Sequence, residues 1–293
     1  MQGVYSVLPT PFAPDGSFDS PSLGRVIDLF LEDGVSGFTA LGVTSEVARI
    51  SDRERDEILD ASMAHADGRV PVIVGATGPG LDVCLERCRA AERAGAAGVM
   101  VSPPRAPKCN SEAIFRHFAR IAETISIPVV IQDFPPISGF HMEPDLLARI
   151  CREIPSARTI KLEDAPTPYK AARIRERTEG LEIGIFGGLG GAYLIEELIS
   201  GATGAMTGFA YPKLLVAVVS RWDAGDRDGA AAAFYQYAPV MRFEFQEGIG
   251  MAIRKEMLRR RGAIAHTGIR APAALLDRAT EEALDRILAH FEL

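Results

Sequence analysis

Short apolar segments alternate with longer amphipathic segments along most of the chain. Eight of the short segments are rich in β-branched or apolar residues and predict strands at 4–8, 37–41, 70–75, 98–101, 128–131, 159–162, 181–186 and 201–206. The segments between them carry apolar residues at helical spacing after a polar start, as at 52–66, 81–94, 111–124 and 143–151. Because the strands are continuous apolar runs, the pattern is typical of parallel strands covered on both faces.

Eight strand and helix units favour a closed (β/α)8 TIM barrel, whose usual size is about 250 residues, over an open doubly wound sheet. The pattern changes after Trp222, where helical segments at 228–243, 249–261 and 272–290 follow one another without an intervening strand. We therefore expect a barrel over residues 1–224 and a C-terminal helical extension over residues 225–293 that packs on it.

Composition narrows the functional classes. The 293 residues are 47% hydrophobic and carry a net charge of -7, so the chain offers no basic field for nucleic acid or for an anionic membrane. It contains no basic-then-apolar leader and no apolar run long enough to span a bilayer, so a cytoplasmic location is expected. Its four cysteines and five histidines are scattered, which predicts no disulfide framework, no metal site and no cofactor.

Candidate chemistry lies at the ends of the strands, because the active site of a TIM barrel forms where its strands end. Lys161 closes the sixth predicted strand. Burial disfavours an ammonium group and makes lysine an amine that can form a Schiff base with a carbonyl substrate. The alternative is a lysine whose ammonium extends to solvent at a strand end.

Two glycine-containing loops offer further candidates. Residues 42–46 combine backbone N–H groups with hydroxyls after the second strand, which suits a carboxylate, although helix capping by Thr44, Ser45 or Ser51 is the alternative. Residues 187–191 are rich in glycine but lack dinucleotide-binding spacing, so they more simply allow a substrate to approach the backbone. No motif of a serine hydrolase or of a kinase is present.

The order of these landmarks resembles the dihydrodipicolinate synthase/N-acetylneuraminate lyase family across essentially the whole chain. The matching segments are 10–12 with 15–16, 42–46, 132–135, 160–161 and 201–204. The resemblance implies a (β/α)8 barrel and a class I aldolase or dehydratase that acts on pyruvate or another 2-keto acid without a metal, commonly as a homotetramer. It also implies that Lys161 is the Schiff-base lysine and that Thr44 holds the carboxylate of the keto acid.

The chain departs from the family pattern at several positions. Pro104 and Arg105 stand where dihydrodipicolinate synthases carry a pair of tyrosines at the end of the fourth strand. Val43 replaces the first hydroxyl of the strand-two loop, and Ile137 stands where dihydrodipicolinate synthases have an arginine for their second substrate. Gln132 occupies the position of a tyrosine that relays protons, and an amide cannot act as an acid or a base. True dihydrodipicolinate synthase activity is therefore not expected. The motif 132–135, followed by Ser138 and Gly139, instead looks like that of the 2-keto-3-deoxy sugar acid dehydratases, particularly those acting on 2-keto-3-deoxy-L-arabonate.

We therefore predict the Schiff-base dehydration of a 2-keto-3-deoxy sugar acid. The alternatives are a retro-aldolase that releases pyruvate and a barrel that binds a keto acid without turnover. The catalytic candidates are Lys161, Gln132 and Asp133, with Glu163, Asp164 or a water as further proton carriers. The substrate-binding candidates are Thr44, Ser45, Val43, Gly188, Met206 and Arg105. Arg105 either binds a distal carboxylate or hydroxyl of the substrate or forms an ion pair. A small keto acid is the expected ligand, and the protein is expected to form a homo-oligomer, either a tetramer or a dimer.

Overall fold

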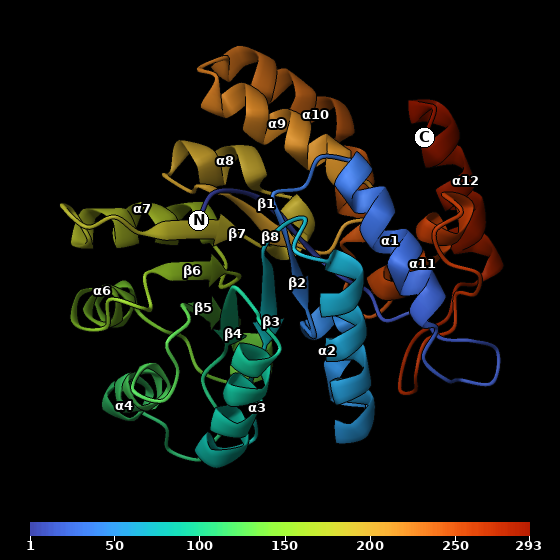
Figure 1. The fold of residues 1–293 in the computed structure, drawn as a ribbon. Helices are drawn as coiled ribbons and strands as arrows, with labels where there is room; N and C mark the ends of the chain where they lie inside the picture. The colour runs from blue at the N-terminus through green and yellow to red at the C-terminus, as the bar shows by residue number, and fades with distance from the viewer.

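Eight parallel strands close into a barrel in sequence order, which confirms the predicted fold class. The computed structural model describes all residues from 1 to 293, and Figure 1 shows the strands at the centre of the ring of helices. The strands are β1 (Gly3–Val7), β2 (Gly37–Ala40), β3 (Val72–Gly75), β4 (Gly98–Val101), β5 (Val129–Asp133), β6 (Thr159–Leu162), β7 (Gly184–Gly187) and β8 (Gly204–Thr207). The C-terminal ends of all eight strands therefore lie at one end of the barrel, here called the mouth.

Helices follow the strands and cover the outside of the barrel. They are α1 (Ser20–Glu32), α2 (Asp52–Ala66), α3 (Leu81–Arg93), α4 (Ser111–Ala122), α6 (Pro144–Glu153), α7 (Thr167–Arg177), α8 (Leu194–Ile199) and α9 (Pro212–Asp223). A short helix, α5 (Pro135–Ser138), and three 3-10 turns, η1 (Val43–Ser45), η2 (Val47–Arg49) and η3 (Leu189–Gly191), lie at the mouth. Ser51 caps α2 in a capping box with Glu54.

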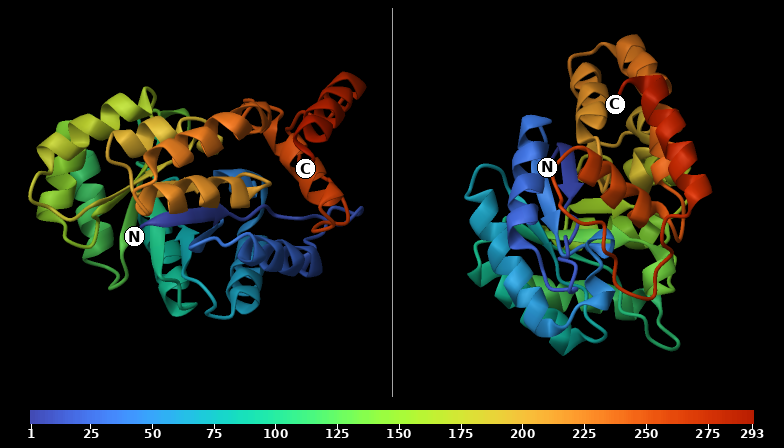
Figure 2. Two further views of the ribbon diagram at one scale, coloured as in Figure 1. Left: turned by 90° about the horizontal axis from the view of Figure 1, so that it is seen from above. Right: turned by 90° about the vertical axis from the view of Figure 1, so that its right-hand side faces the viewer.

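The C-terminal extension contains α10 (Arg227–Glu244), α11 (Gly250–Arg260) and α12 (Arg278–Phe291). Helix α10 packs against α9 and also contacts α11 and α12, and Figure 2 shows these orange and red helices gathered along one side of the molecule. The last helix begins six residues later than expected, because the Asp277 side chain accepts the Thr280 N–H and caps it there.

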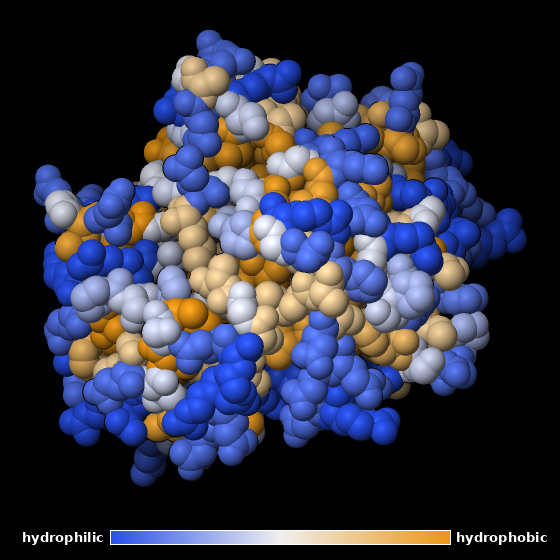
Figure 3. All heavy atoms as spheres, viewed as in Figure 1, coloured by the Kyte–Doolittle hydropathy of each residue, from blue (hydrophilic) through white to orange (hydrophobic).

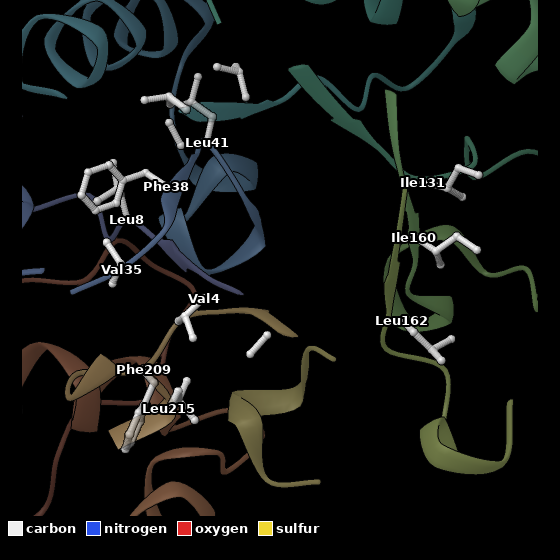
Figure 4. Close-up of a cluster of buried hydrophobic side chains, with 14 of the residues drawn as sticks. Val4, Leu8, Val35, Phe38, Leu41, Ile131, Ile160, Leu162, Phe209 and Leu215 are labelled. Atoms are coloured by element: carbon white, nitrogen blue, oxygen red, sulfur yellow. The ribbon is translucent and has the colours of Figure 1, made fainter. Parts of the chain in front are cut away.

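Side chains alternate between the inside and the outside of the barrel wall. A large apolar core lies between the strands and the helices, and Figure 4 shows Ile131, Ile160 and Leu162 in it. A smaller apolar cluster fills the barrel interior and consists of Tyr5, Ile73, Met100, Val130, Phe186 and Met206. Because every second residue of a strand faces the same side, Gln132 follows Val130 on the inner face, one step nearer the mouth.

The outer surface is mixed in character. Hydrophilic residues dominate the periphery of the face in Figure 3, and hydrophobic residues form smaller areas between them. None of the helices combines the length and the apolar character needed to cross a bilayer.

A carboxyl group is buried behind the seventh strand. Glu197 of α8 is 1% exposed, and the Thr167 hydroxyl donates a hydrogen bond to its Oε1 at 2.6 Å. Its Oε2 occupies the space that a side chain at Gly187 would need, so only glycine fits in the strand there. Burial raises the pKa of Glu197 from 4.5 to about 7.

Glu197→Gln is expected to change the pH dependence of stability. Between pH 4.5 and about 7 the folded state keeps a proton that the unfolded chain releases, so the free energy of unfolding falls as pH rises. The variant mimics the protonated form. The free energy of unfolding of the variant should equal that of the wild type below pH 4.5. Near pH ~8 it should exceed the wild-type value by on the order of 2 kcal/mol. Urea unfolding at both pH values tests this, and an equal effect at the two values would contradict it.

Candidate active site

Lys161 lies on the inner face of β6 at the mouth. It is paired in register with Gln132 of β5 and with Phe186 of β7. The side chain is nearly inaccessible, since Lys161 is only 4% exposed. This burial contradicts the alternative of a lysine that extends to solvent, and it leaves the amine directed toward the group of polar side chains described next.

A carboxylate is held beside the Lys161 amine. The Lys161 Nζ lies 3.2 Å from Oε1 of Glu163, and Gln132 Nε2 donates to Oε2 of the same carboxylate at 2.8 Å. The Ser102 hydroxyl donates to Gln132 Oε1 at 3.1 Å, which fixes the amide with its NH2 group toward Glu163. A side chain at Gly188 would clash with Glu163. Gly188 thus provides room for this carboxylate, and its predicted contact with the substrate stays a prediction.

Asp133 does not join this group, although the sequence placed it there. Strand β5 extends two residues further than expected, and Asp133 pairs in register with Leu162. Consecutive strand residues face opposite sides, so Gln132 faces the mouth and Asp133 faces the surrounding helices. There its Oδ2 lies 2.5 Å from Nζ of Lys170 on α7. Burial raises its pKa to about 6, and this carboxyl has no route to a substrate at Lys161.

Asp164 also lies away from Lys161. Its Oδ2 accepts from Lys170 Nζ at 2.8 Å, and its Oδ1 lies 3.0 Å from Nδ1 of His141. Of the three carboxylates weighed from the sequence, Glu163 is the one that the fold places against the Lys161 amine.

The strand-two loop is braced from both sides. The Ser45 hydroxyl donates to the Leu8 carbonyl at 2.5 Å and accepts from the Gly42 N–H at 3.1 Å. Glu46 is buried, and its Oε1 accepts from Lys255 Nζ at 2.6 Å. The Ser45 hydroxyl proton is therefore already donated within the protein, to the residue that follows β1, and the substrate contact predicted for Ser45 stays a prediction.

Thr44 differs from Ser45. Its hydroxyl oxygen is buried and has no hydrogen-bond partner in the protein. Buried hydroxyl groups nearly always hydrogen-bond, because desolvation without a partner is costly. The Thr44 hydroxyl is thus free to donate to a ligand, as its predicted role at a carboxylate requires.

A cavity of about 480 Å³ opens beside this loop. Val43, Gln132, Arg105 and Ile137 are among its lining residues, so the apolar side chain of Val43 faces space that a substrate can enter. Arg105 is exposed and forms no ion pair within the chain, which leaves its guanidinium available. Met206 instead lies in the apolar interior layer, where it contributes to the floor beneath the site.

Ser102 is a member of the site that sequence reasoning missed. It directly follows β4, two residues after the inward-facing Met100, so strand periodicity alone would have placed it at the mouth. Glu163 was weighed only as one carboxylate among three, because its reach depends on the space above Gly188.

The model of the Dihydrodipicolinate synthetase family matches residues 1–291. This chain belongs to that family. The family resemblance predicted from the sequence is therefore confirmed, and the protein is a lyase of the dihydrodipicolinate synthetase family. The L-2-keto-3-deoxyarabonate dehydratase of Azospirillum brasilense is 35% identical over 280 residues, which cover 92% of this chain and 88% of that protein.

Solved structures agree with this assignment. A dihydrodipicolinate synthase from Rhodopseudomonas palustris has a TM-score of 0.92 at 34% identity, covering 99% of this chain and 97% of its own. YagE, a prophage protein of the same family from E. coli K12, was solved in complex with pyruvate. It has a TM-score of 0.93 at 25% identity, covering 100% of this chain and 99% of its own. The homo-oligomeric state and the cytoplasmic location of this family member stay predictions.

Proposed function

We propose that this protein dehydrates a 2-keto-3-deoxy sugar acid through a Schiff base on Lys161, with 2-keto-3-deoxy-L-arabonate as the first substrate to test. The observation that carries the proposal is the Glu163 carboxylate, held 3.2 Å from Lys161 Nζ by an amide that cannot itself titrate. A carboxylate thus supplies an acid and base function where the family has a tyrosine. Similarity to the A. brasilense dehydratase supports this choice of substrate.

The proposed reaction begins when the Lys161 amine attacks the C2 ketone and water leaves, giving an iminium. Its positive nitrogen acidifies the C3–H bond. Glu163 takes the C3 proton, and the electron pair forms an enamine with the nitrogen. The enamine expels the C4 hydroxyl, which leaves as water with the proton that Glu163 returns. Hydrolysis of the resulting conjugated iminium frees the lysine and the dehydrated keto acid.

The other residues position the reactants. Gln132 and Ser102 orient Glu163 through the two hydrogen bonds described above. The Thr44 hydroxyl and neighbouring backbone N–H groups hold the C1 carboxylate. The 480 Å³ cavity receives the rest of the substrate, and Arg105 in its lining is available for a distal hydroxyl or carboxylate of that substrate.

Product analysis tests the proposal. Purified protein is incubated with 2-keto-3-deoxy-L-arabonate, a portion is reduced with borohydride for intact-mass measurement, and the small products are identified by mass spectrometry. We expect a covalent adduct and a product lighter than the substrate by one water. Pyruvate plus an aldehyde would identify the retro-aldolase, and an adduct without any product would identify the binding protein. The absence of an adduct with every keto acid would overturn the Schiff base.

Gln132→Tyr is expected not to confer dihydrodipicolinate synthase activity. The variant restores the family tyrosine, but Ile137 still replaces the arginine for the second substrate. It also removes the amide that holds Glu163, so turnover of the deoxy sugar acid should fall about 10- to 100-fold. Assays of both reactions check this, and the appearance of synthase activity would show that the residue at 137 is not decisive.

A further inference from the structure

A buried arginine reaches the same corner of the mouth as Thr44. Arg254 lies on α11 and is 5% exposed. Its Nε donates to Oε1 of Glu244 at 2.5 Å, and the Ala210 N–H donates to the other oxygen of Glu244 at 2.9 Å. The Nη1 of Arg254 is buried and has no partner. A buried guanidinium normally uses its donors, so Nη1 is held in place by the Glu244 pair while its own N–H groups stay free.

Gly208 explains how the guanidinium fits. This residue directly follows β8, and a Cβ atom built on it would clash with Arg254 Nη1 and lie 2.8 Å from Thr44 Oγ1. The backbone of Gly208 is not in the left-handed region, so glycine is needed there for space and not for conformation. The free N–H of Arg254 and the free hydroxyl of Thr44 thus border the same small volume.

This volume belongs to the mouth. Met206 of β8 faces the barrel interior, where it clusters with Phe186, and Phe186 is the register neighbour of Lys161. Two residues after Met206, Gly208 lies on the same side of the strand but nearer the mouth. A cavity of about 190 Å³ also touches both Thr44 and Arg254, and Arg49 and Glu247 are among its other lining residues.

We propose that Arg254 Nη1 and the Thr44 hydroxyl together bind the C1 carboxylate of the keto acid, an inference that rests on the proposed function. Val43 lacks the hydroxyl that its loop position carries elsewhere in the family. The Arg254 guanidinium replaces it with a charged hydrogen-bond donor, which is stronger than a hydroxyl. Hydrogen bonds from a cation to a carboxylate are shorter and stronger than neutral ones. The alternative role for Arg254 is purely structural, as the partner of the buried Glu244.

The test compares pyruvate with pyruvamide, which has nearly the same size but no negative charge. Arg254→Met alone leaves Glu244 buried without its partner, which risks unfolding. The informative pair is therefore Glu244→Gln against Arg254→Met/Glu244→Gln, with circular dichroism to verify folding. For each protein, the concentration dependence of the borohydride-trapped adduct is measured by intact mass.

Loss of Arg254 should weaken adduct formation with pyruvate about 10- to 100-fold and change that with pyruvamide less than about threefold. A structural role would weaken both ligands equally and would overturn the inference. Gly208→Ala provides a second variant, because the added methyl displaces the guanidinium while Arg254 and Glu244 remain. It should show the same selective loss of pyruvate. An absence of adduct in the wild type would instead refute the Schiff base itself.

Discussion

Lys161→Ala is expected to abolish both the covalent adduct and turnover, with a loss of at least about 10³-fold in kcat. No other amine lies on the inner face of β5, β6 or β7 to replace it. The fold should survive, because the substitution leaves only a modest cavity and Glu163 keeps its hydrogen bond from Gln132. Borohydride trapping with pyruvate and the dehydration assay measure the two losses, and circular dichroism verifies the fold.

Lys170 provides a matched control for Lys161→Ala, because it is the other buried lysine within the barrel. It stands on α7 and pairs with Asp133 on the far side of β5. Asp133→Asn/Lys170→Met replaces that buried ion pair with neutral groups, a change that proteins often tolerate. This double variant should still gain the mass of pyruvate. Loss of the adduct in the control, or its retention in Lys161→Ala, would place the Schiff base elsewhere.

Glu163→Gln is expected to separate adduct formation from turnover. The amide keeps the size of the side chain and can still accept the Gln132 hydrogen bond, but it cannot take the C3 proton. We expect kcat for dehydration to fall about 10²- to 10⁴-fold, which is the usual contribution of a general base. The trapped adduct with pyruvate should still accumulate, because its formation requires the Lys161 amine and not the proton transfer at C3.

Asp133→Asn and Asp164→Asn provide the comparison for Glu163→Gln. Both carboxylates contact Lys170 behind the barrel wall, so kcat in these variants should change less than about threefold at a temperature where they are folded. A larger loss of kcat in either variant than in Glu163→Gln would transfer the acid and base role to that residue.

The barrel and the position of Lys161 followed from local patterns. Parallel strands covered on both faces are largely apolar, and helices covering a sheet are amphipathic, so eight repeats of these two patterns leave little choice of fold. A lysine at the end of such a strand reaches the mouth whatever the details of packing. The segment before α12 was assigned to that helix because apolar spacing does not show where a cap stops it.

The proton-carrying residue could not be chosen from the sequence. Gln132 and Asp133 are neighbours, and which of them faces the mouth depends on where β5 ends and on its register with β6. The reach of Glu163 depends on the absence of a side chain at Gly188. Likewise, the hydroxyls of Thr44 and Ser45 are equivalent in the sequence, and only the packing of the loop on β1 uses one and leaves the other free.

The sequence by itself determined the family, the barrel and the position of Lys161 at the end of a strand, because these depend on periodicity and on motifs within short segments. The tertiary structure decided which carboxylate stands beside Lys161 and brought Arg254 of the C-terminal extension to Thr44 over Gly208. The physical reason is that strand register and the close approach of distant segments are set by packing across the whole barrel, which no local pattern of residues records.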